Sequence, residues 1–492
     1  MKQIPFGEWL PDLPSYANPG ATVANNVIPL GISYGQFLGQ TVYSNALDAR
    51  CQGAISTKDA SGNTVNFAGN ASKLYKSAAA VYSDVSLAGG YTTNPEENWH
   101  FTRFGDRLIA TNFAENPQSF TLSSSANFAN LTTAIKARYC ATIRDFLVLG
   151  NTYDAVDGNV PHRVRWSAIG DPTDFTVSAS TQSDFDDRNP SYGHVRQIIG
   201  GESGVVFQER AICRMTYVGS PVIWQFDEVE IGKGTQASYA AIKVGNIIPY
   251  LGIDGFYVFD GSQSVAIGSN KVDRTFFSEL DASYLSRIYA VADFDRQIVY
   301  WLYPATGHSS GNGNKILAYN YSPNASMRWA SASDLNLEFM YASISEGYTL
   351  DSLDSLSGSL DALPLSLDSR VYKGENYLLS GFDSNHKQVN FDGSAMTAML
   401  ETQEVQLFPS KRSYISRIRP LVDGSGTVTA QMGTRNLQSE SVTYGSSASV
   451  GANGDCPVRS NARYQRVRVN ISGGFTHAQG VEVVEASSAG SR

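Results

Sequence analysis

The sequence predicts an all-β protein built from many short strands, and three observations lead to this prediction. The 492 residues include 44 Gly, 26 Tyr and 23 Phe beside abundant Ser, Thr and Asn, a composition that favours strands and tight turns. Apolar stripes with the 3.6-residue period of an amphipathic helix are scarce. Short apolar or alternating runs bounded by turn residues recur along the chain instead, which is typical of a sandwich or a propeller.

The clearest of these runs predict eight strands, at residues 107–113, 146–151, 205–208, 211–217, 247–253, 256–259, 297–303 and 315–321. Three pairs are expected to form hairpins, spanning residues 205–217, 247–259 and 297–321, and Asp254-Gly255 is the strongest turn signal. A loose apolar theme, seen in LIATNF, FLVLGN, GVVFQE, IIPYLG and IVYWLY, recurs about every 40–50 residues. This spacing favours the blades of a propeller.

Two breaks in composition divide the chain. Residues 349–369, TLDSLDSLSGSLDALPLSLDS, form a low-complexity segment that we expect to project as a loop and to be cut first by limited proteolysis. From residue 395 onward, ten Lys or Arg face seven Asp or Glu, so the net charge of −9 divides into +3 for residues 395–492 and −12 for residues 1–394. A separate C-terminal β domain is expected to begin there.

The N-terminal segment is expected to be an extended arm. Pro5, Pro11, Pro14 and Pro19 exclude a helix and favour extended chain. The termini of a domain often lie close together, so the arm and the C-terminal domain are predicted to form one platform. The predicted division has the arm and platform strands at 1–90, a propeller at 91–394 with an insertion near 349–369, and the C-terminal platform domain at 395–492.

Charge and cysteine usage exclude several classes of protein. The acidic net charge argues against a protein that grips nucleic acid by neutralising phosphates. Cys51, Cys140, Cys213 and Cys456 are widely separated and form no CxxC pair, which predicts buried free thiols in a reducing compartment. The chain has no apolar leader and no stretch approaching the ~18 apolar residues that a membrane span needs, so no membrane span is expected.

Few local patterns point to catalysis. Residues 31–35, Gly-Ile-Ser-Tyr-Gly, match the G-x-S-x-G nucleophile elbow, with Ser33 in the nucleophile position. A hydrolase elbow lies within an alternating β/α sheet, whereas Ser33 follows a proline-rich arm, so we interpret the motif as a turn between two strands. Paired carboxylates of the glycosidase type could meet at loop ends without any local signature, and no pair stands out.

Metal and phosphate motifs are incomplete. The six histidines do not fall at HxH, HxxxH or HExxH spacing, and no metal site is predicted. The acidic cluster at 184–188, Asp-Phe-Asp-Asp-Arg, lacks the glycine and the terminal glutamate of an EF-hand, so a solvated loop is preferred to a Ca²⁺ site. Residues 232–235, Gly-Lys-Gly-Thr, lack the first glycine of a phosphate loop and are interpreted as a turn between blades. No cofactor is expected.

Basic residues gather on two predicted C-terminal strands. Arg466 and Arg468 alternate with valines, which places both guanidiniums on one face of a strand. That face is either an ordinary solvated surface or an interface with an acidic neighbour. The candidate interface residues are Arg417, Arg419, Arg463, Arg466 and Arg468.

Four runs carry a resemblance to a known family: residues 163–175, RVRWSAIGDPTDF, residues 249–261, PYLGIDGFYVFDG, and the C-terminal runs RYQRVRV at 463–469 and FTHAQGV at 475–481. These runs resemble the tail nozzle family of short-tailed bacteriophages, also called tail tubular proteins B or packaged-DNA stabilisation proteins. The resemblance implies a β-propeller carried on a β-sandwich platform, the latter formed by the C-terminal region and the N-terminal arm.

The resemblance also implies a structural role in the virion tail and no enzymatic activity. Six copies would form a tube below the head-to-tail adaptor ring, retaining packaged DNA and guiding its ejection, after assembly in the host cytoplasm. The implied partners are five further copies, the adaptor ring, tail fibre, spike or needle proteins, and double-stranded DNA that passes without tight binding. An acidic wall suits such a conduit, because each phosphate neutralised would add affinity and slow the passage.

Under this interpretation the five arginines face a neighbouring subunit or the adaptor ring. Replacing Arg466 and Arg468 by Glu is then expected to weaken assembly without affecting the fold of an isolated chain. The alternatives are another tail part, such as an adaptor, hub or receptor-binding protein, and a propeller glycosidase.

Overall fold

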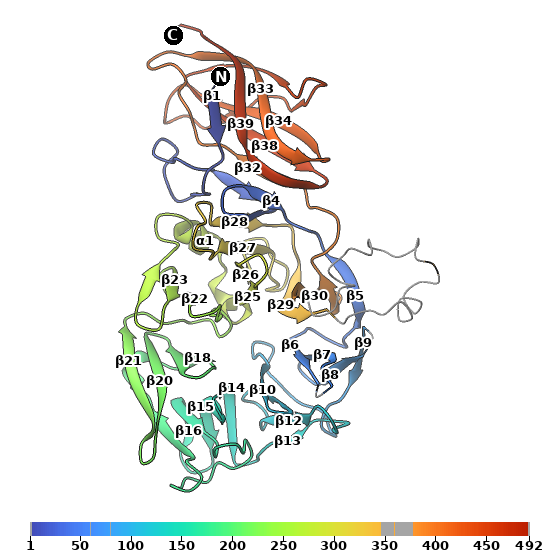
Figure 1. Ribbon diagram of the computed structural model, residues 1–492, viewed down its shortest axis with the longest axis vertical. Helices are drawn as coiled ribbons and strands as arrows, with labels where there is room; N and C mark the ends of the chain where they lie inside the picture. Colours follow the sequence, from blue (N-terminus) through green and yellow to red (C-terminus); the bar gives the residue numbers. More distant parts are fainter. Residues whose placement is uncertain (1, 60, 79, 346–358, 360–376, 491–492) are drawn as a thin grey trace.

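The computed structural model describes residues 2–59, 61–78, 80–345, 359 and 377–490. Within these residues the regular secondary structure is almost all β, with one α-helix, α1 (Asp273–Glu279), and two 3-10 helices, η1 (Pro190–Tyr192) and η2 (Ala282–Arg287). Figure 1 shows a ring of small sheets and, at the top, a second module that holds both chain ends. The predicted all-β fold is confirmed.

In the described part of the chain the ring is a β-propeller of seven antiparallel blades, the sixth of which is part of a larger sheet. Blade 1 consists of β6 (Gly53–Lys58), β7 (Thr64–Gly69), β8 (Leu74–Ala78) and β9 (Val81–Asp84). Blade 2 consists of β10 (His100–Phe104), β11 (Arg107–Thr111), β12 (Gln118–Thr121) and β13 (Ala129–Asn130). Blade 3 consists of β14 (Ile135–Ile143), β15 (Phe146–Asp154), β16 (Gly158–Trp166) and β17 (Asp184–Asp187). Blade 4 consists of β18 (Val195–Ile199), β19 (Gly204–Gln208), β20 (Ala211–Gly219) and β21 (Ile223–Ile231).

The remaining three blades complete the ring. Blade 5 has three strands, β22 (Ile248–Leu251), β23 (Phe256–Phe259) and β24 (Ser264–Ala266). Blade 6 is β25 (Tyr289–Asp293), β26 (Ile298–Tyr303), β27 (Lys315–Asn320) and β28 (Trp329–Ala332). Blade 7 is β29 (Leu337–Ile344), β30 (Tyr377–Asp383), β31 (Lys387–Asn390) and, as its outermost strand, β5 (Thr41–Ala46).

The recurring apolar theme of the sequence marks one position in the blades. LIATNF, FLVLGN, GVVFQE and IVYWLY lie on β11, β15, β19 and β26, each the second strand of its blade, while IIPYLG forms the first strand of blade 5. These strands are buried on both faces because apolar clusters fill the space between successive blades. All three predicted hairpins are present, as β19–β20, β22–β23 and β26–β27.

The ring closes through a strand from the N-terminal part of the chain, and this corrects the predicted domain boundary. β5 pairs with β31 in blade 7, and the chain then continues directly into blade 1. The propeller therefore begins well before residue 91. The sequence did not predict blade strands within residues 53–84, because these strands contain many Ser, Thr, Asn, Ala and Gly residues and no long apolar run. Many of these small side chains are nevertheless buried between neighbouring blades.

The second module is a sandwich of two antiparallel sheets. One sheet contains β1 (Lys2–Pro5), β3 (Val27–Pro29), β4 (Tyr34–Gln36), β33 (Ser413–Gly424), β37 (Cys456–Ala462) and β39 (Phe475–Ser488). The other contains β2 (Val23–Asn25), β32 (Ala398–Glu401), β34 (Thr427–Arg435), β35 (Thr443–Tyr444), β36 (Ala448–Ser449) and β38 (Tyr464–Ser472). Ile4 and Phe6 from the arm are fully buried in this module, so the predicted platform of arm and C-terminal region is confirmed.

One sheet runs through both modules. β28, the outer strand of blade 6, pairs in parallel with β2, and β2 pairs on its other side with β32 of the platform. The arm therefore forms the bridge between the two modules, as Figure 1 shows for the region around β4 and β28. This continuous hydrogen-bonded sheet couples the platform to the ring.

Other sequence predictions have mixed outcomes. Cys51, Cys140, Cys213 and Cys456 are all buried with free thiols, as predicted. Among the described residues, no helix has the length and apolar character needed to cross a bilayer. The predicted loop at 349–369 lies outside the described residues apart from Ser359, and its accessibility to protease stays a prediction.

Candidate functional site

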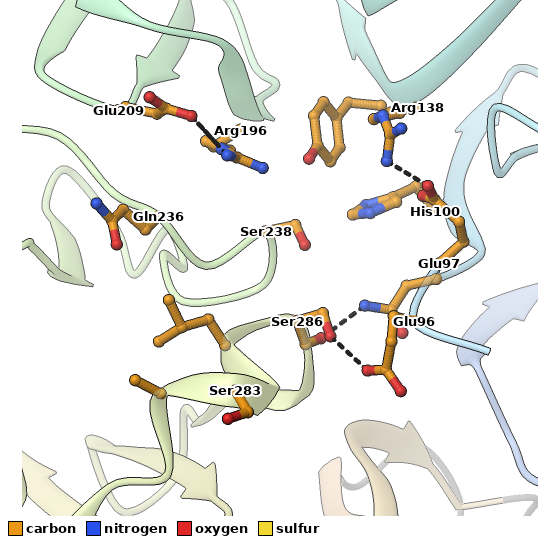
Figure 2. Close-up of a pocket in the computed structure, with 14 residues that line it drawn as sticks. Glu96, Glu97, His100, Arg138, Arg196, Glu209, Gln236, Ser238, Ser283 and Ser286 are labelled. Carbon is orange, nitrogen blue, oxygen red and sulfur yellow. Dashed lines mark hydrogen bonds and ion pairs between the residues drawn. The ribbon is translucent and has the colours of Figure 1, made fainter. Parts of the chain in front are cut away.

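A polar cavity of about 400 Å³ opens at the centre of the propeller. Figure 2 shows that its walls come from several blades and that the labelled side chains converge on a common space. The cavity is lined by Glu96, Glu97, Asn98, His100, Arg138, Tyr139, Arg196, Glu209, Gln236, Ser238, Ala282, Ser283, Leu285 and Ser286. We call it the axial pocket.

The construction of the ring places these residues together. Most lie on an innermost strand or on the segment that leads into one, such as residues 96–100 before and at the start of β10, and η2 before β25. Arg138 lies on β14, and Arg196 on β18. Because innermost strands of a propeller converge on its axis, residues far apart in the sequence meet there.

Each carboxylate of the axial pocket is paired with an arginine. Arg138 forms an ion pair with Glu97 from the neighbouring blade, and Arg196 Nη2 lies 2.5 Å from Glu209 Oε1. Glu96 Oε1 lies 2.6 Å from Nη2 of Arg287, whose side chain is almost fully buried. The three carboxylates are thus balanced by three guanidiniums, and the pocket carries no net charge from these groups.

Aromatic rings form another part of the wall. His100 stacks on Tyr239 with ring centroids 4.3 Å apart, and Tyr139 meets the same imidazole edge-on at 4.8 Å. Burial, with a smaller contribution from the Arg138 cation, lowers the pKa of His100 to about 3. The imidazole is therefore neutral at neutral pH and acts as an aromatic wall.

Glu96 of the axial pocket lacks the property that the general acid of a glycosidase needs. A glycosidase needs one carboxyl with a raised pKa as its general acid. Burial raises the pKa of Glu96, but the hydrogen bonds and charge of Arg287 outweigh it and hold that pKa below its usual value. Among the described residues, no group of three or more His, Cys, Asp or Glu is placed to hold a metal ion.

The structure places the predicted interface arginines in two separate networks of the platform. Arg417 and Arg419 lie on β33, where Arg417 Nε is 3.1 Å from Glu485 Oε2 and Arg419 Nη1 is 3.2 Å from Glu482 Oε2. Asp455 also pairs with Arg419, at 2.9 Å. Both arginines remain substantially exposed, at 49% and 40% of their side chains, and stay accessible to a neighbour.

Arg466 and Arg468 share one face of β38, as the alternation predicted, but both form ion pairs with a carboxylate of the same chain. Their Nε atoms both lie 2.9 Å from the carboxylate of Glu401, which is only 1% exposed. Tyr444 donates its hydroxyl to the same carboxylate at 2.6 Å, and Thr22 of the arm donates at 2.8 Å. We call these five residues the Glu401 cluster.

This cluster corrects one expectation from the sequence. Replacing Arg466 and Arg468 by Glu would place three carboxylates together at a buried site, so the fold of the isolated chain would be affected. Arg463 lies apart from the cluster: its backbone N–H donates to Asn436, and its Nε is buried without a hydrogen-bond partner among the described residues. The pairing of all five arginines with a neighbouring protein stays a prediction.

Ser33 lies in the turn between β3 and β4, as interpreted from the sequence. Its Oγ is 2.8 Å from Nδ1 of His477, a pairing that resembles part of a catalytic triad. The serine is completely buried, however, so no substrate carbonyl can reach its hydroxyl in this conformation. The hydrogen bond ties the arm to β39 of the platform.

Two other motifs have structural roles. The acidic residues at 184–187 form the edge strand β17, which corrects the predicted loop; Asp187 Oδ1 accepts a hydrogen bond from Arg163 Nε at 2.6 Å. Arg163 in turn stacks on Phe185 at 4.0 Å. Gly232 and Lys233 lie in the connection between blades 4 and 5, as interpreted, and Lys233 donates to the carbonyl of Ser264 at 3.0 Å.

Sequence reasoning missed the axial pocket. The nearest local signal is the pair Glu96-Glu97 followed by Trp99-His100, but this run matches no binding motif. The partners of Glu97 and Glu96 are Arg138 on blade 3 and Arg287 just before blade 6, and only the packing of blades in the ring brings them to the pocket.

No family model and no curated protein matches the chain. Among solved structures, a chain of the mitotic checkpoint complex is similar to it with a TM-score of 0.39 and 10% identity, covering 73% of this chain and 94% of that chain. A chain from the complex of BBS1N with ARL6DN is similar with a TM-score of 0.41 and 7% identity, covering 73% and 97%. Values this low carry no information on function.

Proposed function

We propose that this protein is a structural ring subunit of a bacteriophage tail, a nozzle through which packaged DNA is retained and then ejected. The proposal rests on the sequence resemblance described above and on one structural observation. A single hydrogen-bonded sheet continues from blade 6 through the arm into the platform. A subunit that must hold a channel open against DNA pressure needs its modules coupled in such a way.

The resembling runs occupy framework positions. Residues 249–261 form the β22–β23 hairpin, and the C-terminal runs form parts of β38 and β39, central strands of the two platform sheets. Residues 163–175 begin at the end of β16 and include Arg163 of the buried ion pairs. The resemblance therefore concerns residues that maintain the architecture, which supports a structural role.

The distribution of charge supports a conduit. Residues 1–394, which contain the arm and the propeller, carry a net charge of −12, whereas residues 395–492 carry +3, which together give the −9 of the chain. An acidic inner wall would repel the phosphates of passing DNA, whereas several inward lysines or arginines per subunit would add up to a strong brake. The exposed Arg417 and Arg419 on the platform are the arginines available to an acidic neighbour.

The test is the oligomeric state of the full chain, with and without the adaptor ring. Mass photometry and negative-stain images are expected to show closed six-fold rings with a central lumen wide enough for duplex DNA. Trimers with exposed receptor-binding surfaces would favour a host-binding tail protein instead. A chain that remains monomeric in the assembled particle, or that binds DNA tightly without sequence preference at physiological salt, would overturn the proposal.

A further inference from the structure

The ion pairs of the axial pocket leave specific hydrogen-bonding capacity unused. Arg196 donates both of its bonds to Oε1 of Glu209, and Arg138 contacts Oε1 of Glu97. No protein donor among the described residues bonds to Oε2 of either glutamate. A guanidinium has five N–H donors and a carboxylate about four lone-pair sites, so each pair still offers donors beside acceptors.

This pattern matches adjacent hydroxyl groups. A hydroxyl both donates and accepts, so a vicinal diol can donate to the carboxylate and accept from the guanidinium of one Glu–Arg pair. The pocket has two such pairs, Glu97–Arg138 and Arg196–Glu209, and Gln236 and Ser283 add polar groups at its wall. Leu285 and the His100 ring provide apolar surface for the C–H groups of a sugar ring.

Charge balance narrows the class of ligand. Three carboxylates and two guanidiniums line the cavity, and the third carboxylate, Glu96, is paired with Arg287 behind the wall, so neither an anion nor a cation finds an unpaired charge among these groups. A cavity of about 400 Å³ lies in the range of small-molecule sites. We propose that the axial pocket binds a neutral, hydroxyl-rich ligand, namely one sugar residue of a glycan.

The proposal is independent of the nozzle function, since it concerns the centre of each propeller and not the lumen of a ring. It is tested by ligand-observed NMR on the full chain with two matched pairs of sugars, galactose with galacturonate and glucose with glucuronate. We expect a neutral hexose to bind with a Kd of about 1 mM and its uronate to bind at least about tenfold more weakly.

Three variants locate the binding. Ser238→Trp fills the pocket and should abolish binding, whereas Ser124→Trp, on an exposed turn of blade 2, should leave it unchanged. Glu209→Gln removes one carboxylate and leaves Arg196 unbalanced, so it should weaken the neutral hexose about tenfold and improve binding of the uronate. This reversal is a result that a merely destabilised fold would not produce.

Each result of these binding measurements either supports the sugar site or overturns it. Absence of binding by both neutral hexoses, or binding that survives Ser238→Trp, would overturn the proposal. Equal binding of the hexose and its uronate by the unmodified chain would also overturn it, because charge balance would then play no part in selection. If Ser238→Trp fails to fold, the charge preference and its reversal in Glu209→Gln decide the matter alone.

Discussion

The Glu401 cluster should contribute strongly to the stability of the platform, and Glu401→Gln tests this. The substitution keeps the size of the side chain but removes the carboxylate that Arg466 and Arg468 share. Breaking a buried ion pair by removing one partner costs about 3–5 kcal/mol. Both guanidiniums keep some contact with water, at 16% and 24% exposure, so we expect a loss of about 3 kcal/mol, the lower end of that range.

The effect should be local to the sheet that joins the modules, because Thr22 of the arm also donates to Glu401. Hydrogen exchange measured by mass spectrometry can follow the amides of β2, β32 and β38 separately from those of the blades. A loss of about 3 kcal/mol corresponds to roughly hundredfold faster exchange of the most protected amides in these strands. The urea midpoint of the platform should fall as well.

Glu485→Gln is the matched control, since it removes one carboxylate from an ion pair on the same module. Glu485 is largely exposed and pairs with the half-exposed Arg417, so the midpoint and the exchange rates should not change measurably. If Glu401→Gln behaves like this control, burial of the carboxylate does not make the cluster stabilising, and the reasoning is refuted.

Two further predictions concern pH. The pKa of His100 is lowered to about 3, chiefly by burial. Between that pH and about 6.5 the unfolded chain therefore binds one proton more than the folded chain, and the free energy of unfolding decreases by up to about 1.4 kcal/mol per pH unit as the pH falls. His100→Gln should flatten this part of the curve of unfolding free energy against pH, and an unchanged slope would contradict the prediction. Burial, together with Asp12 and Asp254, raises the pKa of Asp273 to about 6, so the folded chain loses stability as the pH rises from about 3.8 to about 6, and the full loss is present above that pH. Asp273→Asn, which can still accept from the Phe256 N–H, should raise the urea midpoint at pH 8 more than at pH 4.5, and an equal change at both values would argue against it.

Much of the propeller could be predicted from the sequence because its signals are local. Apolar runs that are buried on both faces mark the second strands β11, β15, β19 and β26, and the Asp254-Gly255 turn marks the β22–β23 hairpin. The side-chain period of two along a strand is likewise local, so the shared face of Arg466 and Arg468 was predicted correctly.

Local sequence signals could not predict blade 1 or the closure of the ring. Residues 53–84 have small and polar side chains in their strands, and whether these are buried depends on blades 2 and 7 beside them. β5 carries no mark that it pairs with β31, which lies more than three hundred residues further along the chain.

The charged groups show most clearly what the sequence alone determined and what only the tertiary structure decided. The sequence determined which residues are charged, their balance along the chain and the face on which strand residues point. The partner of each charge was decided by folding: Arg468 meets Glu401 at a separation of 67 residues, and Thr22 meets it at 379. In the axial pocket, Glu96 likewise meets Arg287 at a separation of 191 residues, across the ring. Coulomb attraction and hydrogen bonding depend on distance in space, and no local pattern encodes distance between strands that far apart in the chain.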